Sequence, residues 1–501
     1  MFAAFSLRNF LSLTPGAFLP PGIQRARARA ALLLGVTLIL PALLLGAGSA
    51  PTGEAAVATT QPPAAPADLG AEPLVRVLGL LTNRVGEVRQ RAYLELKRRN
   101  DPRAVAGLIE LLRLPRYHSF QEIPQLLLEM TGEDHGVDWV AWNEWLTAQE
   151  KVELPPDFLG WKAALFRLID PEFNRFLFPN VPLRVRAEEI VWGGVAKDGI
   201  PALTQPKTLA ASEAGYLTPE ELVFGVEING EARAYPHRIL DWHELVNDVV
   251  GGVPVSLAYC TLCRSGILFE TTVGGRTFTF GTSGLLYRSN KLMYDHQTES
   301  LWMMLPGEPV SGALATSGLR LKKLPVVVTT WGDWLRRHPA TRVLSLDTGH
   351  QRDYRPGAAY GGYFASPLTM FPVPQRDPRL PPKEEVFALM VNGQPKAYPL
   401  AVLRSESVLN DTVGGDLIVL VTDAQSGAVR AYERGLRRFR ALEAESGLLR
   451  AADGSRWSVT EAALVREGSG ERLPRLAGHT AYWFGWFSFF PQTLLYEPKG
   501  E

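Results

Sequence analysis

The sequence predicts an α+β protein, in which an N-terminal α-helical segment precedes a strand-rich domain built from two copies of one unit. Apolar residues recur at helical spacing between 69 and 152. The run VFGVEINGEARAYP, which begins at Val223, returns as VFALMVNGQPKAYP at Val386. Segments 329–344 and 481–496 also share Trp-x-x-Trp and a later Pro-x-Thr. Such self-similarity indicates an internal duplication whose halves pack as a pseudo-symmetric pair.

Length and charge narrow the class of protein. The 501 residues allow roughly three domains. Hydrophobic residues make up 46% of the chain, which is ample for a core, and 52 basic residues balance 52 acidic ones. Nucleic-acid-binding proteins usually carry a basic excess, so we expect no nucleic-acid partner.

Residues 1–50 have the pattern of a signal peptide or an N-terminal anchor. Three arginines, the last at Arg29, precede the apolar run 31–45 and then small residues up to Ala50. A basic region, an apolar run and a small-residue cleavage site direct export. We expect a periplasmic or other extracytoplasmic protein, cleaved after Ala50 or held to the inner membrane by 31–45. Membrane contact is expected only there.

Residues 51–68 form a Pro/Ala-rich linker, and residues 69–152 form a helical segment. Asp101 and Pro102 supply a helix cap and a proline at the first helical position. The paired short helices resemble HEAT-like repeats, which commonly bind other proteins. This segment is therefore predicted to recruit a protein partner.

The first copy, 188–346, follows a connector at 155–215 and opens as a hairpin. Asn229-Gly230 predicts a type I′ turn between two strands, because both positions need positive φ. Pro236 is expected to begin a helix that Gly251-Gly252 ends. Residues 253–259 then form a buried strand that leads to Cys260, and a further hairpin turns at Gly274-Gly275.

A loop, 347–382, joins this copy to the degenerate second copy, 383–497. Long loops without periodicity are uncommon unless they are functional or disordered. The Tyr, Phe and Arg content of this loop favours order. We expect it to cover a cleft between the halves.

Comparison of the two copies points to a site in the first one. The framework residues persist, whereas three residues with chemical potential change: His243 aligns with Glu406, Cys260 with Asp423, and Cys263 with Ser426. A functional site is therefore expected in the first copy, with the second copy structural.

The Cys260-x-x-Cys263 motif has three interpretations. An exported protein would hold a disulfide in an oxidising compartment. The pair is alternatively a redox dithiol. The third interpretation is a metal site of Cys260, Cys263 and His243, with His296 the weaker fourth ligand and zinc or copper the metals such ligands suit. No His follows Cys263, which excludes c-type haem, and no nucleotide-binding fingerprint occurs.

A cluster of acid–base side chains offers another site. Asp295, His296 and Glu299 lie close together in the sequence and suffice for general acid–base chemistry beneath loop 347–382. The more common role of such a cluster is a solvated turn. Six tryptophans are expected in the core: Trp302, Trp331, Trp334, Trp457, Trp483 and Trp486.

Several long motifs resemble those of a bacterial and archaeal family catalogued as domain of unknown function 3179. They include ARAYPHRILDWHELVNDVVGGVPVSLAYCTLCRSG, FGTSGLLYRSNKLMYDHQTESLW and DTGHQRDY, and the similarity spans about 188–496. It implies an exported protein without an established activity. Family members usually have a YCPLC-like run followed by Gly, where this chain has Thr261 and Arg264, and they tend to have Arg at His296.

The leading hypothesis is an exported protein with a thiol redox or metal site at Cys260, Cys263 and His243. The alternative is a cell-envelope binding or scaffold protein in which the cysteines form a structural disulfide. Whether the protein is an enzyme stays open at this point.

Overall fold

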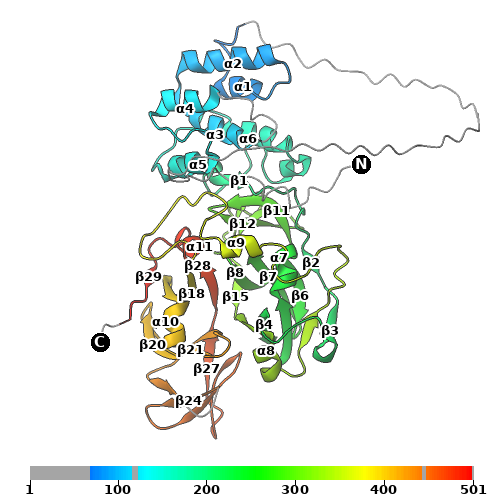
Figure 1. Ribbon diagram of the computed structural model, residues 1–501, viewed down its shortest axis with the longest axis vertical. Helices are drawn as coiled ribbons and strands as arrows, with labels where there is room; N and C mark the ends of the chain where they lie inside the picture. The colour runs from blue at the N-terminus through cyan, green and yellow to red at the C-terminus, as the bar shows by residue number, and fades with distance from the viewer. Residues whose placement is uncertain (1–67, 115–121, 443–446, 499–501) are drawn as a thin grey trace, which may run out of the picture. The chain divides into compact units, whose positions relative to one another are not determined.

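A computed structural model describes residues 68–114, 122–442 and 447–498 (Figure 1). The predicted signal or anchor at 1–50, and all but the last residue of the linker 51–68, lie outside the described residues. The chain is mixed α+β, with N-terminal helices followed by a region of several sheets, as predicted in outline. Within the described ranges, no helix is both long enough and apolar enough to cross a membrane.

The N-terminal helices occupy residues 74–175. The α-helices are α1 (Leu74–Leu80), α2 (Gly86–Arg99), α3 (Val105–Leu112), α4 (Glu122–Thr131), α5 (Trp139–Ala148) and α6 (Phe158–Arg167), and the 3₁₀ turns include η2 (Pro102–Ala104) and η4 (Pro171–Arg175). Asp101 caps η2 through Arg103 N–H, with Pro102 at the first position, as the sequence indicates. Helix α6 lies where only a connector was expected. Its residues Phe158, Trp161 and Leu165 are buried in the same apolar cluster as residues of the other N-terminal helices.

The first copy begins with an open sheet of order β16-β4-β5-β17-β3. Its strands are β3 (Thr208–Ala210), β4 (Leu222–Ile228), β5 (Glu231–Pro236), β16 (Val327–Thr330) and β17 (Arg342–Leu344). Strands β4 and β5 form the predicted hairpin, with φ of 50° at Asn229 and 83° at Gly230. Helix α8 (Trp331–Arg337) joins β16 to β17, which runs parallel to β5.

Helix α7 (His237–His243) is shorter than the sequence suggests. It ends at Glu244, which adopts a left-handed conformation with φ of 55°. The predicted continuation to Gly251 is wrong, because residues 245–250 form a strand and Gly251-Gly252 make its hairpin turn. Leu245 and Val246 fit a helical stripe equally well, and both are buried as strand residues.

A second sheet, of order β15-β8-β7-β6-β2, carries the cysteine motif. Its strands are β2 (Leu203–Thr204), β6 (Leu245–Val250), β7 (Val253–Cys260), β8 (Ser265–Glu270) and β15 (Lys322–Leu324). Strand β7 confirms the predicted buried strand that leads to Cys260. The hairpin of β9 (Thr272–Val273) and β10 (Arg276–Thr277) turns at Gly274-Gly275, also as predicted.

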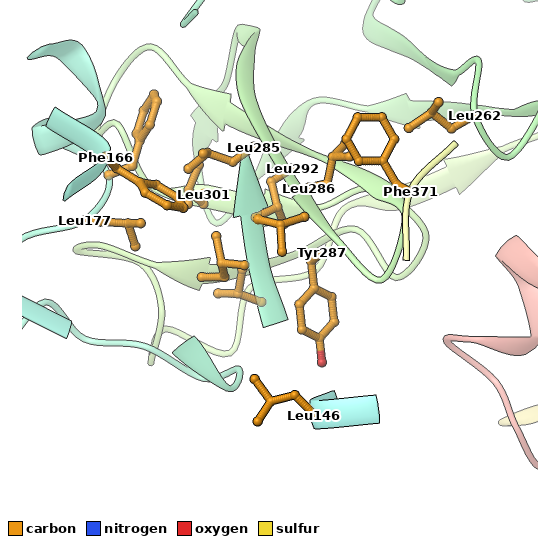
Figure 2. Close-up of a cluster of buried hydrophobic side chains, with 14 of the residues drawn as sticks. Leu146, Phe166, Leu177, Leu262, Leu285, Leu286, Tyr287, Leu292, Leu301 and Phe371 are labelled. Atoms are coloured by element: carbon orange, nitrogen blue, oxygen red, sulfur yellow. The ribbon is translucent and has the colours of Figure 1, made fainter. Parts of the chain in front are cut away.

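A third sheet, of order β1-β11-β12-β13-β14, packs against the N-terminal helices. Its strands are β1 (Ile190–Trp192), β11 (Phe280–Tyr287), β12 (Asn290–Asp295), β13 (Leu301–Met303) and β14 (Glu308–Ser311). Figure 2 shows one apolar cluster in which Leu146 and Phe166 from the helices lie with strand residues such as Leu285 and Leu301. The cluster extends to Leu262, inside the cysteine motif.

The second copy has a corresponding sheet of order β28-β18-β19-β29 and an eight-stranded sheet from β20 to β23. Its elements are β18 (Glu385–Val391), β19 (Gln394–Pro399), α10 (Leu400–Ser405), β20 (Val408–Val413), β21 (Asp416–Thr422), β22 (Val429–Glu433), β23 (Phe439–Ala441), β24 (Leu448–Ala451), β25 (Arg456–Val459), β26 (Ala463–Arg466), β27 (Arg472–Leu476), β28 (Gly478–Tyr482), α11 (Trp483–Phe487) and β29 (Leu494–Leu495). The Asn410 side chain bonds the backbone of Phe439, which brings β20 and β23 together. The large sheet is therefore nearly closed.

Matching hydrogen bonds hold equivalent parts of the two copies. Trp334 Nε1 donates to Thr341 Oγ1 over 2.9 Å, and Trp486 Nε1 donates to Thr493 Oγ1 over 2.8 Å. The shared Trp and Thr positions therefore form one indole-to-hydroxyl bond in each copy. The six tryptophans expected in the core are all buried.

Candidate thiol site

The two cysteines lie at the end of one strand and in the turn that follows it. Cys260 is the last residue of β7, and Arg264, with φ of 49°, completes the turn into β8. Cys260 is 1% exposed and Cys263 is fully buried. Their Sγ atoms are 3.5 Å apart and are not joined by a disulfide. The structure therefore presents a buried pair of neighbouring thiols.

The hydrogen bonds around the pair distinguish the two sulfurs. Cys263 Sγ donates to Ser289 O over 3.1 Å and accepts from Asn290 Nδ2 over 3.3 Å. Burial opposes ionisation of Cys260, but hydrogen bonding with the Cys263 side chain and with the backbone N–H groups of Cys263 and Lys291 holds the pKa of Cys260 below its ordinary value. Burial and the adjacent Cys260 raise the pKa of Cys263 well above its ordinary value. Cys260 is thus the thiol that ionises first.

A buried carboxylate and a buried ammonium adjoin the pair. Glu244 Oε1 accepts from Thr261 Oγ1 over 2.7 Å, and Lys291 Nζ donates to Glu244 O and lies 3.8 Å from Oε2. Burial raises the pKa of Glu244 and lowers that of Lys291. The charge of an ionised Cys260 raises the pKa of Lys291 and so opposes the effect of burial. The Lys291 ammonium therefore lies close enough to the thiolate to interact with it electrostatically.

The segment between the copies covers the turn that holds the cysteines. It contains helix α9 (Gly361–Ala365), where Tyr363 Oη donates to Leu262 O over 2.7 Å. Farther along, Pro372 O accepts from Ser289 Oγ over 2.6 Å. Tyr360 is partly buried and lies beside Thr261 and Glu244. Segment 347–382 therefore shields the thiols from solvent.

The second copy supplies the remaining wall. Tyr482 N–H donates to Cys263 O over 2.7 Å. A Cβ at Gly485 would lie 2.7 Å from Cys263 Cβ and 3.0 Å from its Sγ, so α11 approaches the cysteine this closely only because residue 485 is glycine. The site is therefore formed jointly by the two copies.

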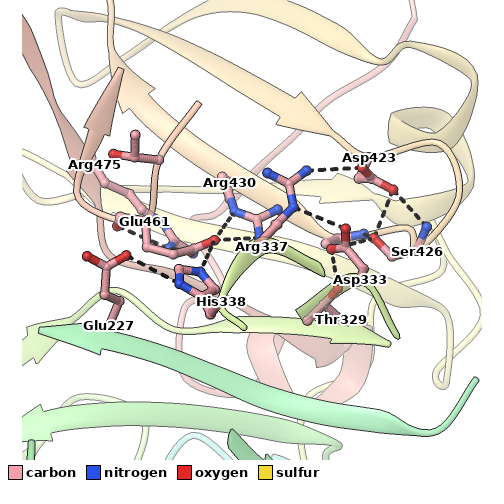
Figure 3. A network of polar contacts seen from close by, with 12 residues as sticks. Glu227, Thr329, Asp333, Arg337, His338, Asp423, Ser426, Arg430, Glu461 and Arg475 are labelled. Atoms are coloured by element: carbon pink, nitrogen blue, oxygen red, sulfur yellow. Dashed lines mark hydrogen bonds and ion pairs between the residues drawn. The ribbon is translucent and has the colours of Figure 1, made fainter. Parts of the chain in front are cut away.

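The equivalent place in the second copy is filled by a polar network instead (Figure 3). Ser426 Oγ bonds Asp333 Oδ2 over 3.3 Å, and Arg337 pairs with Asp423 over 3.2 Å. Asp423 and Ser426 stand where the first copy has Cys260 and Cys263, so α8 contacts this turn as α11 contacts the cysteines. Beside it, Arg430 and Arg475 pair with Glu461.

His243 is buried, and its ring nitrogens bond groups other than the cysteines. Its Nδ1 bonds Pro201 O over 2.7 Å and its Nε2 bonds Tyr354 Oη over 2.6 Å, which occupies both ring nitrogens. Burial, with His350 and Arg352 nearby, lowers the pKa of His243 to about 4. The ring is therefore neutral at physiological pH.

His296 is exposed and stacks on Tyr294, with ring centroids 5.2 Å apart. Across the part of the chain that the structure describes, no group of three or more His, Cys, Asp or Glu side chains could hold a metal ion. The metal-ligand set considered from the sequence, which joined His243 and His296 to the cysteines, is not assembled there.

The acid–base cluster has structural partners. Asp295 is buried and accepts from Trp302 Nε1 over 2.9 Å and from Thr298 N–H over 2.6 Å. Glu299 pairs with Arg175 over 2.9 Å. These contacts fix the turn between β12 and β13 to the helical segment.

Several residues of the site were missed by sequence reasoning. Glu244 had a detectable signal, because it aligns with Ser407 by the same comparison that singled out His243. Lys291 and Tyr363 had none, since they reach the thiols from a later strand and from the segment between the copies.

Residues 197–493 match the model of the family described as protein of unknown function (DUF3179). No curated protein and no solved structure matches the chain.

Proposed function

This chain belongs to the DUF3179 family, and we propose that its Cys260–Cys263 pair is a reversible dithiol–disulfide centre of an exported protein. The observation that carries the proposal is the 3.5 Å separation of the unbonded sulfurs. Because a disulfide bond is about 2.05 Å long, the atoms need to approach by only about 1.5 Å to join.

The polar contacts support different roles for the two sulfurs. The thiolate is the reactive form of cysteine, and the hydrogen bonds to Cys260 favour its thiolate. Cys263 keeps its proton because burial raises its pKa. Cys260 is therefore the attacking sulfur and Cys263 the resolving one.

The oxidant in this proposal is a molecule that carries a disulfide. The Cys260 thiolate attacks one substrate sulfur, the substrate S–S bond breaks, and the first fragment leaves as a thiolate. That thiolate takes the Cys263 proton, Cys263 then attacks Cys260 Sγ, and the second fragment leaves as a thiolate. The protein loses two electrons and gains a disulfide, while the substrate is reduced to one thiol and one thiolate.

Lys291 and Glu244 set the charge balance of the step. The Lys291 ammonium favours the Cys260 thiolate, whereas an ionised Glu244 disfavours it. Burial raises the pKa of Glu244, which keeps its carboxyl group protonated more often. Lys291 is therefore left to stabilise the thiolate that attacks.

Access to the sulfurs requires movement of the cover. Both are at most 1% exposed, so α9 has to leave the turn before a substrate sulfur reaches Cys260. It contacts the turn through the hydrogen bond from Tyr363 to Leu262 O and through the Phe364 ring, which lies 5.1 Å from the Arg264 guanidinium. Lys383 also holds the helix by donating to Tyr363 O and Ser366 O. Small segments held in this way open at modest cost in free energy.

Thiol exchange is favoured over a metal site by the number of donors. A structural zinc site normally has four ligands, and in the described ranges only two thiols converge here. The export component of the proposal rests on the basic and apolar pattern at 25–45. It places the pair in a compartment where disulfides form.

The test uses the full chain in glutathione redox buffers, with free thiols alkylated and counted by mass spectrometry. The wild type should lose two alkylation sites together in one reversible two-electron transition. Cys263→Ser should accumulate a mixed disulfide with glutathione at Cys260, whereas Cys260→Ser should accumulate far less.

Three results would contradict the proposal. One is a wild-type pair that stays reduced in every buffer. Another is near-stoichiometric zinc or copper in the same preparation that is absent from the double serine variant, which would make the thiols metal ligands. The third is a disulfide that forms but is reduced only on unfolding, which would indicate the structural role.

A further inference from the structure

We infer that an open pocket beside the cysteine turn binds the zwitterionic end of a small amino-acid disulfide, a molecule of the cystine class. The inference rests on the proposed function and names its substrate class. The pocket has a volume of about 300 Å³, and Arg264, Phe364, Glu384, Arg404 and Tyr482 are among its lining residues. Volumes of this size suit small molecules.

The pocket adjoins the thiol site through both of its walls. Arg264 directly follows Cys263, and Tyr482 N–H donates to Cys263 O over 2.7 Å. Phe364 lies on α9 next to Tyr363, whose hydroxyl bonds Leu262 O. A ligand in the pocket therefore lies against the helix that covers the cysteines.

Two of the basic groups of the pocket already have partners. Arg264 pairs with Glu385 over 3.1 Å, and its guanidinium lies 5.1 Å from the Phe364 ring centroid. Lys383 Nζ donates to Tyr363 O and, over 2.6 Å, to Ser366 O. These groups shape the wall and hold α9 in place, so they are not free to bind a ligand.

Two opposite charges of the pocket have no partner. Among the described residues, neither the Arg404 guanidinium nor the Glu384 carboxylate has an ion pair or a side-chain hydrogen bond. A guanidinium binds a carboxylate through paired N–H donors, and a carboxylate binds an ammonium. One free group of each sign within a single small pocket matches the carboxylate and ammonium of an amino acid.

A disulfide between two amino acids carries both the charged groups that the pocket can bind and the S–S bond that the thiols can reduce. One amino-acid end binds Arg404 and Glu384, and the S–S bond then lies beside α9. After α9 moves, Cys260 attacks as described above, and the products are two thiol amino acids, one of them as the thiolate, and the protein disulfide. An uncharged disulfide has no ionised group with which either side chain could form a charge-paired hydrogen bond.

The test compares oxidation of the thiol pair of the full chain by cystine and by bis(2-hydroxyethyl) disulfide, which carries no charge. Cystine should react at least about tenfold faster, since losing one charged hydrogen bond costs roughly that factor. Arg404→Ala and Glu384→Gln should remove this preference and leave the rate with the uncharged disulfide unchanged. Arg440→Ala changes an exposed arginine of β23 and should alter neither rate.

Calorimetry of cystine with the Cys260→Ser/Cys263→Ser variant separates the two proposals. If cystine binds this variant and Arg404→Ala abolishes the binding, the pocket is supported. If the wild-type thiols nevertheless never exchange, only the redox proposal is overturned. Absence of binding, together with equal oxidation rates for both disulfides, would overturn the pocket while the thiol centre stands.

Discussion

Replacing Gly485 by alanine tests the contact between the second copy and the thiol site. The added Cβ would lie 2.7 Å from Cys263 Cβ, whereas carbon atoms prefer about 3.5–4.0 Å, so the overlap is about 1 Å. Both Cβ atoms are fixed by their backbones. Neither can rotate away, so α11 or the cysteine turn has to shift.

The expected magnitude combines two opposing effects. Overpacking of a well-packed core typically costs about 1–3 kcal/mol. Alanine in place of glycine within a helix recovers at most about 1 kcal/mol. The fixed backbones favour the upper part of the overpacking range, so we expect a net loss of about 1–2 kcal/mol in the free energy of unfolding.

Urea unfolding of the full chain, followed by tryptophan fluorescence, measures this loss. The matched control is Gly362→Ala in α9, where no described atom lies within 4 Å of the new Cβ. The control should equal the wild type or exceed it by up to about 1 kcal/mol. If Gly485→Ala is as stable as the control, the close approach does not limit packing and the argument for this glycine is wrong.

Three further predictions concern the cover, the charge and the pH response of the site. Tyr363→Phe removes the bond to Leu262 O and should speed alkylation of the thiols by about fivefold, as loss of about 1 kcal/mol implies; an unchanged rate would mean that α9 does not gate access. Lys291→Met should raise the pKa of Cys260, seen as an alkaline shift in thiolate absorbance, and no shift would remove Lys291 from the charge balance. Burial raises the pKa of Asp241 to about 7, so the folded state retains a proton that the unfolded chain releases above about pH 4. Stability should therefore fall between about pH 4 and about pH 7, and Asp241→Asn should flatten that fall in urea midpoints; an equally steep fall in the variant would place its cause elsewhere.

The parts of the fold that the sequence predicts are those with local rules. Asn229-Gly230 specifies its hairpin by backbone conformation alone, and Asp101 specifies the cap of η2. The helix at Pro236 was predicted too long, because Leu245 satisfies a helical stripe and a buried strand alike. The helix ends because Glu244 adopts a left-handed backbone conformation. This conformation is uncommon for residues other than glycine, so the sequence does not indicate it.

Of the residues of the candidate site, only the two cysteines could be predicted from the sequence. The two cysteines are close in sequence, so their proximity follows from the motif. His243 was grouped with them because it changes in the same comparison, yet its ring points to Pro201 O and Tyr354 Oη. A comparison of the two copies reveals which positions differ in role. It does not reveal which of these residues are in contact.

The contact of Tyr482 and Gly485 with Cys263 has a consequence for how this chain can be divided. A fragment that stopped at the end of the first copy would keep both cysteines, yet it would lack the wall that desolvates Cys263. Its thiols would meet water, and their pKa values would move back toward those of ordinary cysteines. The later copy, which has no cysteine of its own, thus determines how the earlier pair ionises, and truncation would alter the chemistry of a motif that it leaves intact.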